Sequence, residues 1–142
     1  MTLDPLSRQN IINYRRERSF ATFKEAEFVV QAQFWNLIAN RLYYALFYMC
    51  EALLLSHGIP VNSHAGIMRM MSLHFVKEGK LSYDDGKLLS RLFRMRQTGD
   101  YNDLFYWTQE EILPLFPLVE NLIHKIDALI LTSQDSQESQ SI

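Results

Sequence analysis

The stretch from Phe34 to Leu55 constrains the fold more than any other part of the chain. Drawn as a helix, it is apolar on nearly every side, so it has to be buried on several sides at once. It also holds four polar residues that are costly in a lipid bilayer, Asn36, Asn40, Arg41 and Glu51. We therefore expect a central helix of a helical protein and no membrane span.

Apolar residues recur at helical spacing in the rest of the chain too, whereas the alternation typical of strands is nearly absent. The expected helices span residues 5–31, 33–56, 64–79, 83–98 and 109–131. Pro114 and Pro117 should kink the last helix early, because proline removes a backbone donor. The sequence thus predicts an all-α fold, an antiparallel up-and-down bundle of four to five helices.

Several of these helix starts carry capping signals. Ser82 followed by Asp85, and Thr108 followed by Glu111, have the spacing of a capping box. Ser63 is an expected N-cap for the third helix. These signals indicate helices that start at defined residues.

Length and composition favour a single cytosolic domain. With 142 residues we expect one domain over residues 1–131, followed by a Ser- and Gln-rich disordered tail over residues 132–142. With a net charge of −2, the chain as a whole does not attract nucleic acid, so binding of nucleic acid would need a local basic patch. The polar start of the chain does not resemble a signal peptide, and the one cysteine, Cys50, fits a core position and a reducing cytoplasm.

Arg96 is a charged residue on the apolar side of the expected fourth helix. On a helical wheel it falls near the centre of an apolar arc, and the members of that arc are Leu88, Leu89, Leu92, Phe93 and Met95. Lys87, Arg91 and Arg94 form a basic ridge on the opposite side, which is an ordinary solvated face. A guanidinium keeps its charge at any relevant pH, so Arg96 needs a carboxylate, water or a ligand anion.

Arg41 raises the same question in the central helix, where it lies in line with apolar residues. One interpretation is a buried structural network of Arg96, Arg41 and Asp100. The other is a cleft for phosphate, in which Asp100 backs Arg96 beside the Tyr101 hydroxyl. In both cases Gly99 is expected to end the helix with a left-handed residue, so that Asp100 and Tyr101 fold back.

Two stretches around these arginines resemble the HEPN domain family. The run from Asn36 to Gly58 contains an Arg-x-Tyr-Tyr-Ala-x-Phe pattern, formed by Arg41, Tyr43, Tyr44, Ala45 and Phe47. The run from Ser63 to Tyr101 is similar to the second half of that family's pattern, and its matching features are His64, Gly66, Phe75-Val76-Lys77 before Gly79, and Arg96 before Tyr101. The order and spacing of these features match over residues 20–130.

The resemblance implies a helical homodimer, and many HEPN proteins are metal-independent endoribonucleases that act as toxins paired with a nucleotidyltransferase-like antitoxin. Their signature is an Arg followed, after four to six residues, by a His. Arg96 matches the Arg, but Tyr101 stands where the His is expected. Since a tyrosine is a poor base at neutral pH, these residues fit phosphate binding better than catalysis.

Other sites are not indicated by the sequence. The four histidines, His57, His64, His74 and His124, show no metal-ligand spacing, and no glycine-rich phosphate loop is present, so we expect neither a metal nor a cofactor. The basic run Tyr14–Arg18 and the ridge of the fourth helix together form a candidate RNA-facing patch, although solvated helix faces explain them more simply.

The sequence therefore predicts a nucleotide- or RNA-binding HEPN-type protein, and the resemblance implies a role as the toxin-like partner of a nucleotidyltransferase. The expected catalytic residues are Arg96, Asp100 and Tyr101, and the expected phosphate contacts are Arg41, Tyr44, His64 and Arg96. Two alternatives stay open. One is a non-enzymatic dimeric interaction module with a structural Arg–Asp network, and the other is a metal-independent endoribonuclease.

Overall fold

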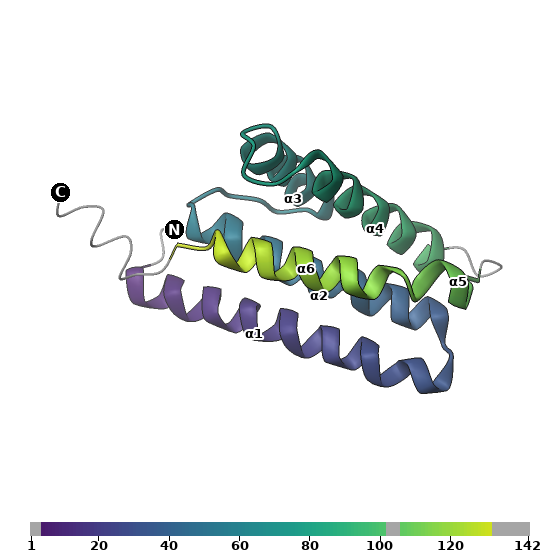
Figure 1. The fold of residues 1–142 in the computed structure, drawn as a ribbon. Helices are drawn as coiled ribbons and strands as arrows, with labels where there is room; N and C mark the ends of the chain where they lie inside the picture. Colours follow the sequence, from purple (N-terminus) through teal and green to yellow (C-terminus); the bar gives the residue numbers. More distant parts are fainter. Residues whose placement is uncertain (1–3, 102–105, 132–142) are drawn as a thin grey trace.

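The computed structural model describes residues 4–101 and 106–131, except for the side chains of residues 99–101. All regular elements in these ranges are helical, which confirms the all-α prediction. The four long helices α1, α2, α4 and α6 run alternately up and down, with α1 and α4 on opposite sides of the bundle (Figure 1). The predicted tail, residues 132–142, lies outside the described residues.

Helix α1 spans Pro5–Val29 and starts at a well-formed cap. The Asp4 side chain accepts a hydrogen bond from the backbone N–H of Ser7, and Pro5 occupies a position where no N–H is needed. A short 3-10 turn, Val30–Ala32, follows, and Gln33 then adopts a left-handed conformation with φ of 58°. This residue reverses the chain into α2, although its surroundings contain no strong turn former.

Helix α2, Trp35–Ser56, is the central helix that the sequence predicts. It packs against α1, α3, α4, α5 and α6, which explains why apolar residues cover it on nearly every side. Cys50 is fully buried in it, as expected. None of the helices in the described ranges has the length and apolar character of a membrane span.

Two polar residues of α2 contact neighbouring segments of the chain. The Asn36 side chain accepts a hydrogen bond of 2.7 Å from the backbone N–H of Trp107, and so ties the segment after α4 to the start of α2. Glu51 lies 3.7 Å from Arg15 of α1. Asn36 therefore fixes the segment after α4 to the bundle, whereas Glu51 is only loosely paired with Arg15.

Helix α3, His64–Met71, continues directly into a π-helical turn, Ser72–Val76. The prediction of one helix over residues 64–79 therefore has the right start, but the helical segment ends at Val76 and its last five residues are π-helical. Gly79 closes this segment with φ of 81°, a conformation that favours glycine. The π-helical turn lies against α4, where Gly86 leaves room for the Val76 side chain.

Helix α4 spans Tyr83–Tyr101, so the prediction that Gly99 ends it is wrong. Glycine permits a left-handed helix end but does not require one, and here the helix continues through it for two more residues. The capping box at the start of α4 is confirmed. The backbone N–H of Ser82 donates to Asp85, and the backbone N–H of Asp85 donates to the Ser82 hydroxyl.

The last predicted helix is divided in two. Helix α5, Gln109–Ile112, begins with the predicted capping box of Thr108 and Glu111, and α6 spans Leu115–Ala128. The two meet around Pro114, whose missing N–H interrupts the helical ladder. The apolar stripe of α6 is buried against α2, as its spacing predicts.

Candidate functional site

Three helices bring together residues that lie far apart in the sequence. Helix α2 contributes Arg41, Tyr43 and Tyr44, helix α3 contributes His64, and helix α4 contributes Arg96. Direct contacts join these five residues, which we call the Arg96 cluster. Four of them were named from the sequence as phosphate contacts, and Tyr43 joins them in space.

His64 is the first residue of α3, and its position is set by the cap before it. The Ser63 hydroxyl accepts a hydrogen bond of 2.9 Å from the backbone N–H of Gly66. A side chain at Gly66 would bring its Cβ within 2.9 Å of that same hydroxyl, so only glycine keeps this cap undisturbed. The cap therefore fixes where α3 begins and where the imidazole of His64 lies.

The imidazole of His64 is held by two aromatic residues of α2. The hydroxyl of Tyr43 lies 2.7 Å from its Nδ1, and the ring of Phe47 stacks on it at a centroid distance of 4.3 Å. Tyr43 is only 1% exposed, and burial raises the pKa of its hydroxyl, although the charge of Arg96 opposes this rise. The hydroxyl therefore keeps its proton.

The tautomer of His64 follows from this contact. A buried hydroxyl needs an acceptor, and Nδ1 of His64 is the acceptor that the described residues offer to Tyr43. When Nδ1 accepts, the neutral imidazole carries its own proton on Nε2. Burial lowers the pKa of His64, and the charge of Arg96 lowers it further, so the neutral form prevails at pH 7.

Arg96 faces the apolar side of α4, as the helical wheel indicates. Its guanidinium carbon lies 5.7 Å from the ring centroids of both Tyr43 and Tyr44. These cation–π contacts offset part of the positive charge of Arg96. Arg96 is partly buried, whereas Arg91 and Arg94 of the same helix are exposed, again as predicted.

Arg41, also in α2, contacts the ring of Tyr44. Its guanidinium carbon lies 5.5 Å from the centroid of the Tyr44 ring. It also donates to Asn40 and lies 3.4 Å from Glu25 of α1. The side chain is 25% exposed, so Arg41 is not part of a fully buried network, and its carboxylate among the described residues is Glu25.

Two predicted catalytic residues cannot be placed in the cluster. The side chains of Asp100 and Tyr101 lie outside the described residues, although the backbone of both belongs to α4. Their proposed roles beside Arg96 therefore stay predictions. In the described ranges, no three His, Cys, Asp or Glu side chains gather as ligands of a metal ion.

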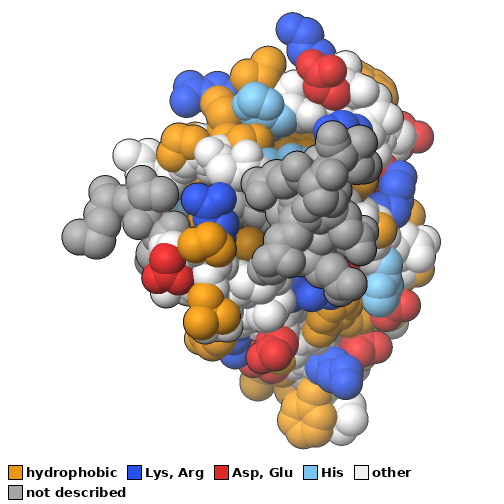
Figure 2. All heavy atoms as spheres, turned by 90° about the vertical axis from the view of Figure 1, so that its left-hand side faces the viewer, with side chains coloured by type: hydrophobic (Ala, Val, Ile, Leu, Met, Phe, Trp, Pro, Cys, Tyr) orange, Lys and Arg blue, Asp and Glu red, His pale blue; other side chains and the backbone are white. Residues whose placement is uncertain are grey.

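The two basic segments do not form one patch. Helices α1 and α4 lie on opposite sides of the bundle (Figure 1), and the three arginines of the basic run Tyr14–Arg18 each have a carboxylate neighbour. Arg15 lies near Glu51, Arg16 bonds to Asp127, and Arg18 lies 4.0 Å from Glu25. Positive and negative side chains are also interspersed over the end of the molecule seen in Figure 2. The candidate RNA-facing patch is therefore reduced to the face of α4.

Sequence reasoning missed how Tyr43, Phe47 and Glu25 take part in the site. Tyr43 and Phe47 belong to the Arg-x-Tyr-Tyr-Ala-x-Phe pattern, which could have drawn attention to them. However, no spacing rule connects a residue of α2 with the first residue of α3. Glu25 lies in an exposed part of α1 and has no distinguishing signal in the sequence.

Comparison with known proteins places the chain among relatives. The family model described as "HEPN domain" matches residues 12–129. A UPF0332 protein of Thermotoga maritima is 33% identical over 87% of this chain and 93% of its own length. Two proteins of Methanocaldococcus jannaschii bear the name "Putative toxin". One is 28% identical over 77% of this chain and 69% of its own length, and the other is 30% identical over 54% and 57%.

Proposed function

The chain belongs to the HEPN domain family, and on this premise we propose that it is a toxin-like HEPN protein whose Arg96 cluster binds the phosphate of a nucleotide or of RNA. The observation that carries this proposal is the position of Arg96. A permanent charge lies between α2 and α4, against the rings of Tyr43 and Tyr44. A guanidinium in that position is suited to bidentate recognition of a phosphate group.

Other members of the cluster reinforce binding of an anion. Arg41 and Arg96 both contact the ring of Tyr44, so two positive charges lie close to one aromatic residue. Neutral His64 offers its Nε2–H as a further donor, because Tyr43 occupies Nδ1. The tyrosine rings give a base or a ribose an apolar surface next to these donors.

The same hydrogen bond argues against His64 as the base of an endoribonuclease. To take a proton from a ribose hydroxyl, an imidazole needs a free nitrogen lone pair. In His64 one nitrogen accepts from Tyr43 and the other carries a proton. Phosphate binding is therefore favoured over RNA cleavage. Cleavage stays the second candidate because an imidazole does lie in the same cluster as Arg96, where it can donate to a leaving group.

We further propose the partners that the family resemblance implies. These are a second copy of the chain and a nucleotidyltransferase-like antitoxin. Two relatives that are named as toxins support a paired system. Sedimentation of the purified chain, alone and with a nucleotidyltransferase-like protein of the same genome, tests both partners. If the chain stays monomeric at micromolar concentration and does not bind the nucleotidyltransferase-like protein, both proposed partners are rejected.

The proposed phosphate site is tested by nucleotide binding. Arg96→Ala should weaken binding of a fluorescent nucleoside triphosphate by roughly ten- to hundredfold, the loss expected for a charge-assisted contact. The matched control is Arg69→Ala, which removes the same kind of side chain from an exposed position of α3. Unchanged binding by Arg96→Ala would reject the site. If the wild type binds no nucleotide and Arg96→Ala has a much lower melting temperature than the wild type, Arg96 belongs to a structural network instead.

Cleavage is tested separately, with labelled RNA and a chelator present. If the wild type cleaves and Arg96→Ala does not, the protein is a metal-independent endoribonuclease. Equal background cleavage by both leaves phosphate binding as the function of the cluster.

A further inference from the structure

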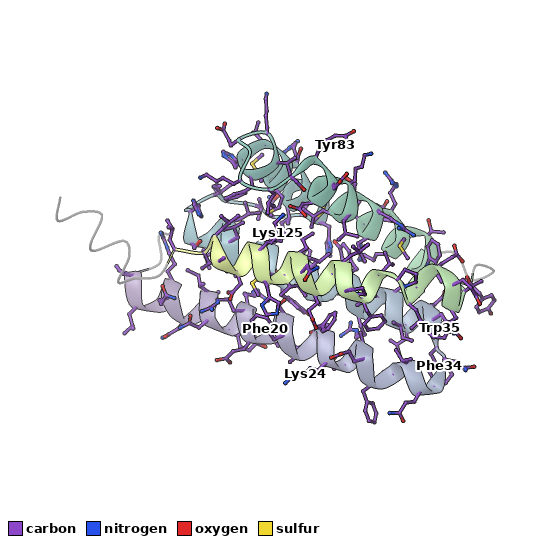
Figure 3. All side chains as sticks on the ribbon, in the orientation of Figure 1. Phe20, Lys24, Phe34, Trp35, Tyr83 and Lys125 are labelled. Atoms are coloured by element: carbon purple, nitrogen blue, oxygen red, sulfur yellow. The ribbon has the colours of Figure 1, made fainter. Side chains whose placement is uncertain are left out.

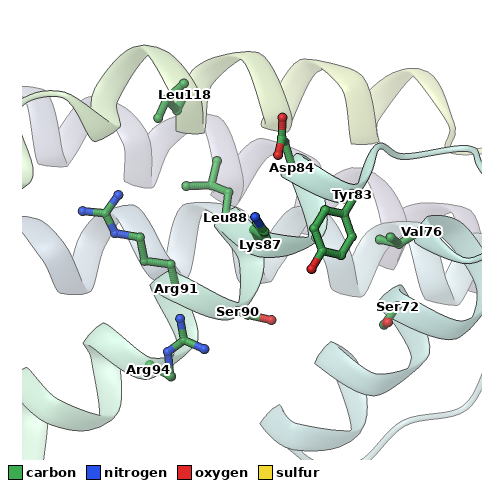
Figure 4. A pocket seen from close by; sticks show the side chains of 11 residues that line it. Ser72, Val76, Tyr83, Asp84, Lys87, Leu88, Ser90, Arg91, Arg94 and Leu118 are labelled. Atoms are coloured by element: carbon green, nitrogen blue, oxygen red, sulfur yellow. The ribbon is translucent and has the colours of Figure 1, made fainter.

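We propose that a second, separate groove along the outer face of α4 binds the backbone of a single-stranded nucleic acid. The groove has a volume of about 700 Å³ and lies between the π-helical turn, α4 and α6 (Figure 4). Its α4 wall carries Tyr83, Lys87, Arg91 and Arg94. We call this set the α4 stripe. The inference rests on the proposed function only in taking nucleic acid as a relevant ligand.

Helical spacing aligns the α4 stripe. Lys87 lies four residues after Tyr83. Arg91 and Arg94 lie four and seven residues after Lys87. These intervals place the side chains on one face in successive turns. From Tyr83 to Arg94 the stripe is about 16 Å long at the rise of an α-helix. An extended polyanion, rather than one small anion, matches this length.

The positive charges of the stripe form no ion pair among the described residues. Arg91 and Arg94 form no ion pair within 4 Å there, whereas Arg15, Arg16 and Arg18 of α1 each have a carboxylate within that distance. One carboxylate, Asp84, lines the groove beside three cations. The groove therefore has a net positive charge that a phosphate backbone can neutralise, with release of counterions.

An exposed aromatic ring distinguishes the groove from a plain basic surface. Tyr83 is 72% exposed and lies on the outer side of the molecule (Figure 3). The Nζ of Lys87 lies 4.8 Å from the centre of its ring. Cationic grooves that carry exposed rings are the pattern of single-strand binding, where bases stack on the rings and phosphates contact the cations. An acidic protein surface would use the charges but would have no need of the ring.

The groove is distinct from the Arg96 cluster. Arg94 and Arg96 are two residues apart and therefore point to nearly opposite sides of α4. Arg96 contacts α2, whereas Arg94 lines the groove toward the π-helical turn and α6. A mononucleotide can therefore occupy the cluster without touching the stripe, and the two sites can be tested independently.

The test measures binding of fluorescent oligouridine and oligothymidine, each about 12 nucleotides long, at several salt concentrations. The triple variant Lys87→Gln/Arg91→Gln/Arg94→Gln should bind roughly tenfold or more weakly, and the slope of log affinity against log salt should become shallower by about 2. The matched control, Lys24→Gln/Lys77→Gln/Lys80→Gln, removes the same charge from exposed residues that do not line the groove. It should retain wild-type binding. A preference for one of the two oligonucleotides would tell RNA from DNA.

The ring is tested by Tyr83→Ala, which should weaken binding roughly tenfold without changing the salt slope. Tyr106→Ala removes an equally exposed ring, 77% exposed, that does not line the groove, and should have no effect. Equal affinity for the triple variant and its control would overturn the proposal. Competition by polyglutamate as strong as that by the oligonucleotide would also overturn it, in favour of an acidic protein partner.

Failure of this proposal can be told apart from failure of the phosphate site. If Arg96→Ala loses the nucleoside triphosphate while the stripe variants keep the oligonucleotide, the groove is wrong and the Arg96 cluster stands. The converse pattern supports the groove and rejects the cluster.

Discussion

The hydroxyl of Tyr43 lies 2.7 Å from Nδ1 of His64 and joins the central helix α2 to the first residue of α3. Because Tyr43 is buried and keeps its proton, this contact fixes the imidazole with its Nε2–H as donor. Arg96 lies against the ring of the same tyrosine. Tyr43 therefore positions both a neutral donor and a positive charge in one cluster.

Removal of this hydroxyl should destabilise the fold. Tyr43→Phe leaves Nδ1 of His64 without its donor, and we expect a loss of about 1–2 kcal/mol in the free energy of unfolding. Tyr44→Phe is the matched control, because its hydroxyl makes no comparable hydrogen bond among the described residues. It should cost less than about 0.5 kcal/mol. Urea denaturation measures both, and equal losses would show that the hydrogen bond contributes nothing.

His64 should make stability depend on pH. Burial, and then the charge of Arg96, lower its pKa below the ordinary value of 6.5, so the folded state binds fewer protons than the unfolded chain. Its contribution to stability is complete above pH 6.5 and declines as the pH falls through the lowered pKa. His64→Gln should flatten this part of a plot of melting temperature against pH. Parallel plots for variant and wild type would contradict the assignment.

Glu51 should oppose folding at neutral pH. Burial raises its pKa, and Arg15 at 3.7 Å only partly offsets this effect. A carboxyl with a raised pKa stabilises the fold below its unfolded value and loses that contribution as the pH rises through the folded value. Glu51→Gln should therefore raise the melting temperature at pH 7, with a smaller gain near pH 4. Exposed Glu78→Gln is the control, and a lower melting temperature for Glu51→Gln at pH 7 would refute the prediction.

Asp85 should stabilise the start of α4. Its carboxylate accepts from the backbone N–H of Ser82 and pairs with Lys125 of α6. Burial raises its pKa, but the bonds to Lys125 and Ser82 outweigh that effect and lower it overall. Asp85→Ala should cost about 1–2 kcal/mol, whereas Asp84→Ala in the same turn should cost only a few tenths. Guanidinium denaturation decides between this result and equal costs for both variants.

Local signals in the sequence were enough to predict most of the helices. The apolar surface of α2, the capping box at Ser82 and the N-cap at Ser63 depend on residues a few positions apart, and the structure confirms each. Two boundaries were wrong for a physical reason. Gly99 permits a helix end that the chain does not use, and Pro114 divides a helix that was expected only to bend.

The candidate site was only partly predictable. Arg96 stands out because one helix places a charge in its own apolar arc. Its partners could not be derived in the same way, since Tyr43 and His64 meet across two helices that are separated by a loop. Periodicity describes the faces of one helix and contains no information about which faces meet. The same limit explains why the neighbour of Arg41 in α1, Glu25, was not predicted under either interpretation.

The most direct test of the phosphate site observes the ring nitrogens of His64 by ¹H–¹⁵N NMR while a nucleoside triphosphate is added. In the free protein, Nδ1 should accept a hydrogen bond and Nε2 should be protonated. The Nε2–H signal should then shift saturably with the nucleotide, and this shift should disappear in Arg96→Ala. Saturable nucleotide binding that leaves the His64 signal unchanged, or that shifts it equally in Arg96→Ala, would contradict the account.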